Sequence, residues 1–187
     1  MMTTTSTRVR CLPSLLAVDE LDVLQEIMSQ NDDETLEDAE LIEGLFENDA
    51  KVVFADFSGR TVSSLRRFLA DRGDSMDLMF SYSIISRKGF AYFLPSINDY
   101  ARSSESGSDC GLPGPFAHAI KKQLRINPAA IFTVRDQVES LSEYLLGHLA
   151  KFDLDDEWER ETSHEFEAIL EILRRNKTAE KDVPSNR

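Results

Sequence analysis

The chain has 187 residues, of which 41% are hydrophobic, and a formal net charge of −13 from 34 acidic and 21 basic residues. This length and composition predict one compact domain. No apolar run approaches the roughly 20 residues of a membrane-spanning helix, which excludes that class of protein. The two cysteines, Cys11 and Cys110, do not form the framework of a disulfide-rich secreted protein. We therefore expect a cytoplasmic protein.

The acidic excess lies in one quarter of the sequence. Between Arg10 and Lys51 there is no lysine or arginine, and this interval holds 13 acidic residues. The rest of the chain has 21 acidic and 21 basic residues, so it is neutral. Direct binding to nucleic acid is disfavoured, because the basic positions are few and lack interleaved aromatic residues.

In chain order, we expect a disordered leader over 1–13, a single globular domain over 14–177 and a disordered tail over 178–187. The first part of the domain, 14–49, is predicted to be helical and acidic. One helix is expected over 14–29, and its apolar face is formed by Val18, Leu21, Leu24 and Met28. A second helix follows, and its apolar stripe is formed by Leu36, Ala39, Ile42, Leu45 and Phe46.

The second part, 50–101, is predicted to contain a small antiparallel sheet. Alternating apolar residues indicate a short strand over 51–57, and a helix after it is expected to end at Gly73. Two further alternating runs flank the sequence SRKG, so that 78–94 is interpreted as a β-hairpin. The predicted fold class is therefore α+β: a mostly helical single domain with a small antiparallel sheet that includes this hairpin.

The sequence FAYFLPSINDY at 90–100 is interpreted as a corner between the last strand and a helix. Proline suits the first position of a helix because it has no N–H group to leave unpaired. The residues assigned to this structural junction are Gly89, Tyr92, Leu94, Pro95 and Tyr100.

The remainder of the domain is divided into a loop over 102–115 and a helical part over 116–177. The loop is rich in serine, glycine and proline, and Asn127-Pro128 is expected to end the helix that follows it. The last two helices have apolar faces and are expected to pack as an antiparallel pair.

Two stretches resemble a family of small bacterial proteins of unknown function. In RKGFAYFLPSINDYA, the pattern G-F-x-[YF]-[FY]-L-P is matched by Gly89, Phe90, Tyr92, Phe93, Leu94 and Pro95. In FTVRDQVESLSEYLLGHL, the match is to Gln137, Val138, Leu141, Leu145 and Leu149. The resemblance covers about 76–152, with Pro-Ser where the family has Pro-Ala. It implies a bacterial origin and a shared fold, and it implies no activity.

No residue is predicted to be catalytic, to bind a cofactor or to bind a metal. The three histidines lie on different predicted helices, and no H-x-x-x-H or C-x-x-C spacing occurs. An alternative interpretation is a small enzyme with a cleft near 78–101, which would use Tyr92, Tyr100 or His118. A second alternative is a structural homo-oligomer that uses the apolar side of the last two helices. The sequence does not fix the oligomeric state.

The acidic block leads to the main functional hypothesis, a non-enzymatic interaction or regulatory module that binds a basic protein. Long-range attraction between opposite charges would steer such a partner. The expected partner-binding residues are Asp32, Asp33, Glu34, Glu37, Asp38, Glu40, Glu43 and Glu47. Two other interpretations stay open: a solvated face that keeps the protein soluble, or docking against the chain's own Arg60, Arg66, Arg67 and Arg72.

Overall fold

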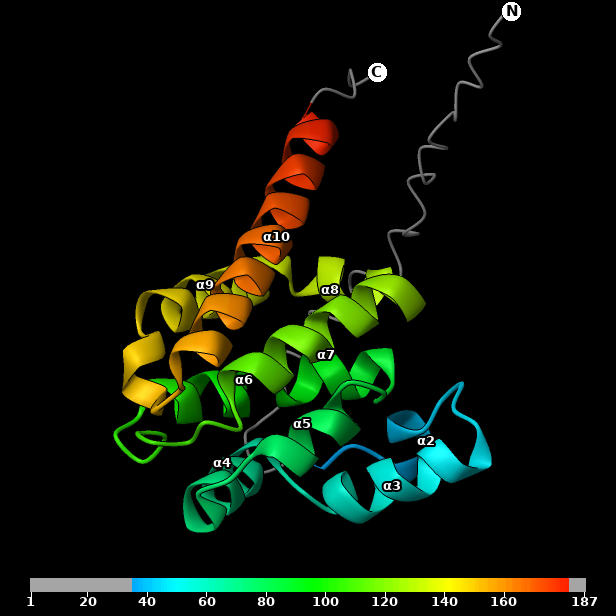
Figure 1. Cartoon of the computed structure of the whole chain (residues 1–187). Coiled ribbons are helices and arrows are strands. Elements are labelled where there is room, and N and C mark those ends of the chain that lie inside the picture. Colours follow the sequence, from blue (N-terminus) through cyan, green and yellow to red (C-terminus); the bar gives the residue numbers. More distant parts are fainter. Residues whose placement is uncertain (1–34, 182–187) are drawn as a thin grey trace, which may run out of the picture.

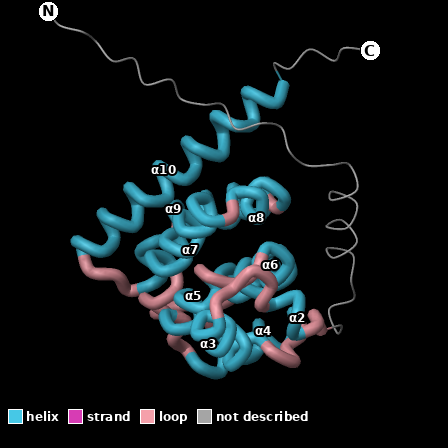
Figure 2. The backbone as a smooth tube through the Cα atoms, turned by 90° about the vertical axis from the view of Figure 1, so that its right-hand side faces the viewer, coloured by secondary structure: helices cyan, strands magenta, loops and turns pink. Residues whose placement is uncertain are grey.

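The computed structural model describes residues 35–181, with side chains described as far as Asn176. Within this range every regular element is a helix, so the predicted α+β fold with an antiparallel sheet is wrong and the fold is all-α (Figure 2). The elements are α2 (Asp38–Leu41), α3 (Glu47–Phe57), α4 (Val62–Arg72), α5 (Met76–Tyr82), α6 (Arg87–Arg102), α7 (Pro113–Ile126), α8 (Pro128–Thr133), α9 (Arg135–Gly147), the 3-10 helix η1 (Leu149–Phe152) and α10 (Asp156–Lys181). None of these helices is long and apolar enough to cross a membrane.

Helix α6 is the centre of the arrangement. It packs against α2 and α4 on one side and against α8 and α9 on the other. Figure 1 shows α2, α3 and α4 at one side of the molecule and the long helix α10 at the other, and α10 packs on α7 and α9. The core between these layers is rich in fully buried aromatic side chains, among them Phe57, Tyr82, Phe90, Phe93 and Phe116.

The predicted β-hairpin over 78–94 is instead the helical pair α5 and α6. Leu78 and Tyr82, four residues apart, are buried, whereas Phe80 between them is 59% exposed. Burial thus follows the period of 3.6 residues of a helix and not the period of two of a strand. The side chain of Ser86 caps α6 by accepting a hydrogen bond from the backbone N–H of Gly89 at 3.1 Å.

The predicted strand over 51–57 is also helical, because it forms the second half of α3. Val53 and Phe57 are buried four residues apart, and Ala55 between them is exposed. The preceding helix is shorter than expected, since α2 has four residues and the chain then turns at Gly44, which has a φ of +77°. Phe46, which we predicted to lie in an apolar stripe, is 84% exposed at the start of α3.

The predicted strand-to-helix corner at Pro95 does not exist, since α6 continues through it. Pro95 has no N–H group to donate to the carbonyl of Ala91, which would be its usual helical partner. Its neighbour Ser96 is fully buried and donates a hydrogen bond from Oγ to the carbonyl oxygen of Val62 at 2.7 Å. The region around the proline is thus fixed to α4 by a side chain. The other residues assigned to the junction are all buried in α6: Gly89, Tyr92, Leu94 and Tyr100.

Helix α4 agrees with the helix expected before Gly73. Leu65 and Leu69 are buried, and Gly73 ends the helix with a φ of +67°, a left-handed conformation that suits glycine. At the other end, Thr61 and Ser64 form a reciprocal capping box. The loop predicted over 102–115 is shorter, residues 103–112, because α6 extends to Arg102 and α7 begins at Pro113. The expected packing of the last two helices is present as the contact of α9 with α10.

Replacement of Gly89 by alanine is expected to lower the free energy of unfolding by about 1–3 kcal/mol, because it overpacks the start of α6. A Cβ atom at this position would lie 2.6 Å from Cδ1 and Cγ1 of Ile85, a side chain that is itself buried. The matched control is Gly147→Ala in α9, where nothing lies within 4 Å of the new atom. That variant should be neutral or more stable, and chemical denaturation of both proteins is the measurement. Equal effects would contradict the close approach at Gly89.

Candidate functional site

The acidic block is the feature that the sequence singled out, and the structure describes part of it. Asp32, Asp33 and Glu34 lie outside the described residues. The other five predicted positions lie on or next to α2 and α3. Four of them are exposed and the fifth, Glu40, is partly buried: Glu37, Asp38, Glu40, Glu43 and Glu47.

Glu40 is the residue that fixes α2 to the rest of the protein. Its carboxylate accepts a hydrogen bond from Nζ of Lys88 at 2.7 Å, with about a third of each side chain exposed. The hydrogen bond to Glu40 raises the pKa of Lys88, and the charges of Glu43 and Glu37 add to this effect. The hydroxyl of Ser86 also donates to the carbonyl oxygen of Glu40 at 2.5 Å. Glu40 therefore has a structural role.

The exposed acids have few partners among the described residues. Asp38 accepts a hydrogen bond from the hydroxyl of Ser58 at 2.6 Å. Glu47 pairs with Lys51 at 2.7 Å, but this pair is largely solvated and contributes little energy. Within residues 35–176, neither Glu37 nor Glu43 forms an ion pair, and the same is true of the exposed Asp49.

Large apolar side chains lie among these acids. Phe46 is 84% exposed, Phe54 is 44% exposed and Val52 is 41% exposed. Glu47 and Phe54 follow each other on one stripe of α3, because they are seven residues apart. We call this region the α2–α3 surface; it comprises Glu37, Asp38, Glu43, Phe46, Glu47 and Phe54. Asp49 and Val52 lie on the opposite flank of α3. Its acids are visible in the sequence, whereas Phe46 was predicted to lie in the apolar stripe of the second helix and Phe54 was given no role.

The residues proposed for the alternative enzyme do not converge on a cleft. Tyr92 and Tyr100 are buried within α6, whereas His118 is exposed on α7. The hydroxyl of Tyr100 donates a hydrogen bond to Oδ2 of Asp109 at 3.0 Å. Burial raises the pKa of Tyr100, and the charge of Asp109 raises it further. This tyrosine is a structural hydrogen-bond donor.

Asp109 holds the loop between α6 and α7 in place. Its carboxylate is 2% exposed and accepts hydrogen bonds from the backbone N–H groups of Ser75 at 3.3 Å and Gly111 at 3.0 Å, in addition to the Tyr100 hydroxyl. Burial raises the pKa of Asp109, while these hydrogen bonds oppose the rise. The group connects α5, α6 and the loop.

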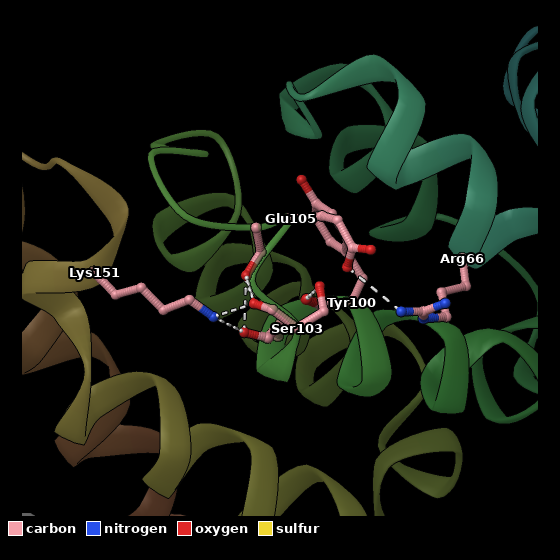
Figure 3. Close-up of polar contacts among 7 residues, drawn as sticks. Arg66, Tyr100, Ser103, Glu105 and Lys151 are labelled. Carbon is pink, nitrogen blue, oxygen red and sulfur yellow. Dashed lines mark hydrogen bonds and ion pairs between the residues drawn. The ribbon is translucent and has the colours of Figure 1, made fainter.

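A lysine completes the anchoring of this loop (Figure 3). Nζ of Lys151 donates hydrogen bonds to the carbonyl oxygens of Ala101 at 2.7 Å and Ser103 at 2.6 Å, where α6 ends. A cation suits the C-terminus of a helix, where carbonyl groups lack helical partners. On the other side of the loop, Glu105 pairs with Arg66 of α4 at 3.4 Å. Within residues 35–176 no group of three or more His, Cys, Asp or Glu side chains is placed to bind a metal.

The described surface has hollows away from the α2–α3 surface, of which one lies between α9, η1 and α10. A polar cavity of about 540 Å³ lies between α6 and α9, and Arg102 extends across it to Ser140. It brings together Pro95 and Gln137, one residue from each of the two stretches that carry the family resemblance. An apolar groove of about 320 Å³ lies between α5, α7 and α10, and Phe80 and Trp158 line it.

Comparison with known proteins found no match: no family model, no curated protein and no solved structure is similar to this chain. The class that can be stated is therefore structural, an all-α protein with an exposed acidic and aromatic surface. The resemblance to bacterial proteins of unknown function stays a prediction.

Proposed function

We propose that this chain is a non-enzymatic interaction module of the cytoplasm, and that it binds a basic protein partner through the α2–α3 surface. The observation that carries the proposal is the presence of exposed acidic and exposed aromatic side chains on the same short segment. Acids alone would be equally well explained as a solvated face. A phenylalanine that is 84% exposed adds nothing to solubility, and aromatic anchors dominate binding energy at protein interfaces.

The charges and the aromatic residues would contribute in different ways. Exposed acids attract a basic protein over a distance and raise the rate of association, an effect that salt screens. Burial of Phe46 and Phe54 would supply affinity that salt does not remove. The partner expected from this chemistry is a protein segment rich in lysine and arginine that also carries an apolar side chain.

Self-docking on the arginines near α4 has less support. Arg60 donates a hydrogen bond to the carbonyl oxygen of Asp56 and lies over the ring of Phe68 at 3.9 Å. Arg66 pairs with Glu105, and Arg72 pairs with Asp77 at 3.0 Å. Among the described acids of the predicted site, Glu47 pairs with Lys51 and Glu40 pairs with Lys88, and neither lysine belongs to the arginine cluster near α4. These contacts favour an external partner.

The test is capture of partners from the source-cell lysate, followed by titration calorimetry with each purified partner at low and high salt. One variant neutralises four exposed acids: Glu37→Gln, Asp38→Asn, Glu43→Gln and Glu47→Gln. At roughly 0.35 kcal/mol for each exposed charge, the dissociation constant should rise about tenfold at low salt and much less at high salt. A second variant, Phe46→Ser with Phe54→Ser, should weaken binding at both salt concentrations.

The matched control removes the same number of charges from α10, at positions that are also exposed: Glu157, Glu159, Glu167 and Glu171, each changed to Gln. It should bind like the wild type at both salt concentrations. If it weakens binding as much as the first variant, only net charge is recognised and the α2–α3 surface is not the site. If all three variants bind as tightly as the wild type, the proposal is wrong.

A further inference from the structure

The apolar groove between α5, α7 and α10 shares no residue with the α2–α3 surface, and its walls expose apolar side chains that a binding partner could cover. Its walls include Met79 and Pro115, and three large apolar side chains on them are incompletely covered. Phe80 is 59% exposed, Trp158 is 42% exposed and Met76 is 40% exposed. Grooves with aromatic and methionine walls are typical binding sites for the apolar face of an amphipathic helix.

We propose that residues 14–29 of this same chain occupy the groove as an amphipathic helix. The sequence of this segment places Val18, Leu21, Leu24 and Met28 on one face, an arrangement that needs an apolar surface to cover it. As a helix, its 16 residues would be about 24 Å long, and a helix of this length rarely persists in water without such packing. The apolar residues of the segment match the apolar side chains that line the groove.

The start of the described chain lies within reach of the groove. Helix α2 begins three residues after Thr35 and packs on α3, and α3 packs on α5, which forms one wall of the groove. Two helix-to-helix steps of 8–10 Å each place α2 roughly 20 Å from α5. The seven residues 29–35 can span up to about 25 Å when extended. The connection is long enough for residues 14–29 to lie in the groove.

The charges around the groove are compatible with this occupant. The four acids of the segment, Asp19, Glu20, Asp22 and Glu26, lie mainly opposite its apolar stripe, so docking leaves them in water. The α7 wall carries a basic stripe, in which Lys122 lies 5.3 Å from the ring centroid of Phe80. The α10 wall carries acids, of which Glu165 is paired with Lys121 at 2.5 Å. Acids at the edge of the docked helix should therefore lie on the α7 side.

Trp158 makes the proposal measurable, because it is the single tryptophan of the chain and it lines the groove. In the full chain, Leu21→Asp combined with Leu24→Asp should release the segment. The fluorescence emission of Trp158 should then shift to longer wavelength. Its quenching by acrylamide should rise about twofold, because a docked helix covers roughly half of the exposed ring. Phe80→Glu, at an exposed position of the groove wall, should give the same two changes.

The control adds the same two charges outside the apolar face, by Gln30→Asp with Asn31→Asp, and should leave the emission unchanged. Unchanged emission in the Leu21/Leu24 variant would overturn the proposal, as would an equal change in the control. Each protein is measured over a hundredfold range of concentration. A wild-type emission that shifts on dilution would mean that a second copy covers the groove, which also overturns the proposal. Circular dichroism verifies that the variants keep their helices.

Discussion

Replacement of Asp109 by alanine is expected to lower the free energy of unfolding by about 3–5 kcal/mol. The carboxylate is 2% exposed and is the acceptor for three donors, two backbone N–H groups and the hydroxyl of Tyr100. The substitution leaves these donors without an acceptor in a buried site. Chemical denaturation monitored by circular dichroism measures the loss.

The matched control for this prediction is Asp71→Ala, an exposed aspartate on α4, which should change the unfolding free energy by less than about 0.5 kcal/mol. Tyr100→Phe removes one of the three donors and should cost about 1–1.5 kcal/mol. In the double variant the two effects should be less than additive, because they remove the same hydrogen bond. Full additivity would contradict the contact between the two side chains.

The pH dependence of the same residue has a definite sign. Burial raises the pKa of Asp109 above its ordinary value of 3.8, so that the folded protein binds a proton more readily than the unfolded chain. The contribution of this group is therefore fully present below pH 3.8 and is lost as the pH rises through the raised pKa. Asp109→Asn lacks this titration. The difference in unfolding free energy between the wild type and this variant should favour the wild type most below pH 3.8. It should decrease as the pH rises through the raised pKa of Asp109.

The helical fold was difficult to predict because the first half of its central helix contains a continuous buried run. Helix α6 has neighbours at α2, α4, α8 and α9, and every residue from Gly89 to Leu94 is buried. Within this short run the hydrophobicity shows no period of 3.6 residues, and the exposed residues of α6, Asp99 and Arg102, come only after Pro95. A short apolar run with aromatic residues then indicates a strand equally well. Helix α4, which has one polar face and a glycine at its end, was predicted correctly.

The candidate site was predictable in its charges and unpredictable in its apolar part. Thirteen acids in an interval without a base are visible in the sequence alone. The exposure of Phe46 depends on the early end of α2 and on the turn at Gly44, and neither leaves a clear signal in the hydrophobic pattern. The groove requires three distant elements, since Phe80 is on α5 and Trp158 is on α10. Such a site exists only after tertiary packing.

Replacement of Phe93 by alanine tests the helical packing directly and is expected to cost about 3–5 kcal/mol of unfolding free energy. The Phe93 side chain is fully buried, and its ring centroid lies 4.9 Å from that of Phe57 on α3. Phe80→Ala, at a side chain that is 59% exposed, should lower the unfolding free energy by less than about 1 kcal/mol.

This pair of variants separates the two interpretations of 78–94. In an alternating hairpin, Phe80 shares a face with Leu78 and Tyr82, and Phe93 faces away from Tyr92 and Leu94. If that face were the buried one, loss of the Phe80 ring would be costly and loss of the Phe93 ring would be tolerated. The helical pair requires the reverse order, because Phe90, Phe93 and Ile97 then follow one another on a single buried face of α6. Urea denaturation therefore distinguishes a helical from a stranded centre: the helical pair requires Phe93→Ala to lose more unfolding free energy than Phe80→Ala, and the hairpin requires the opposite.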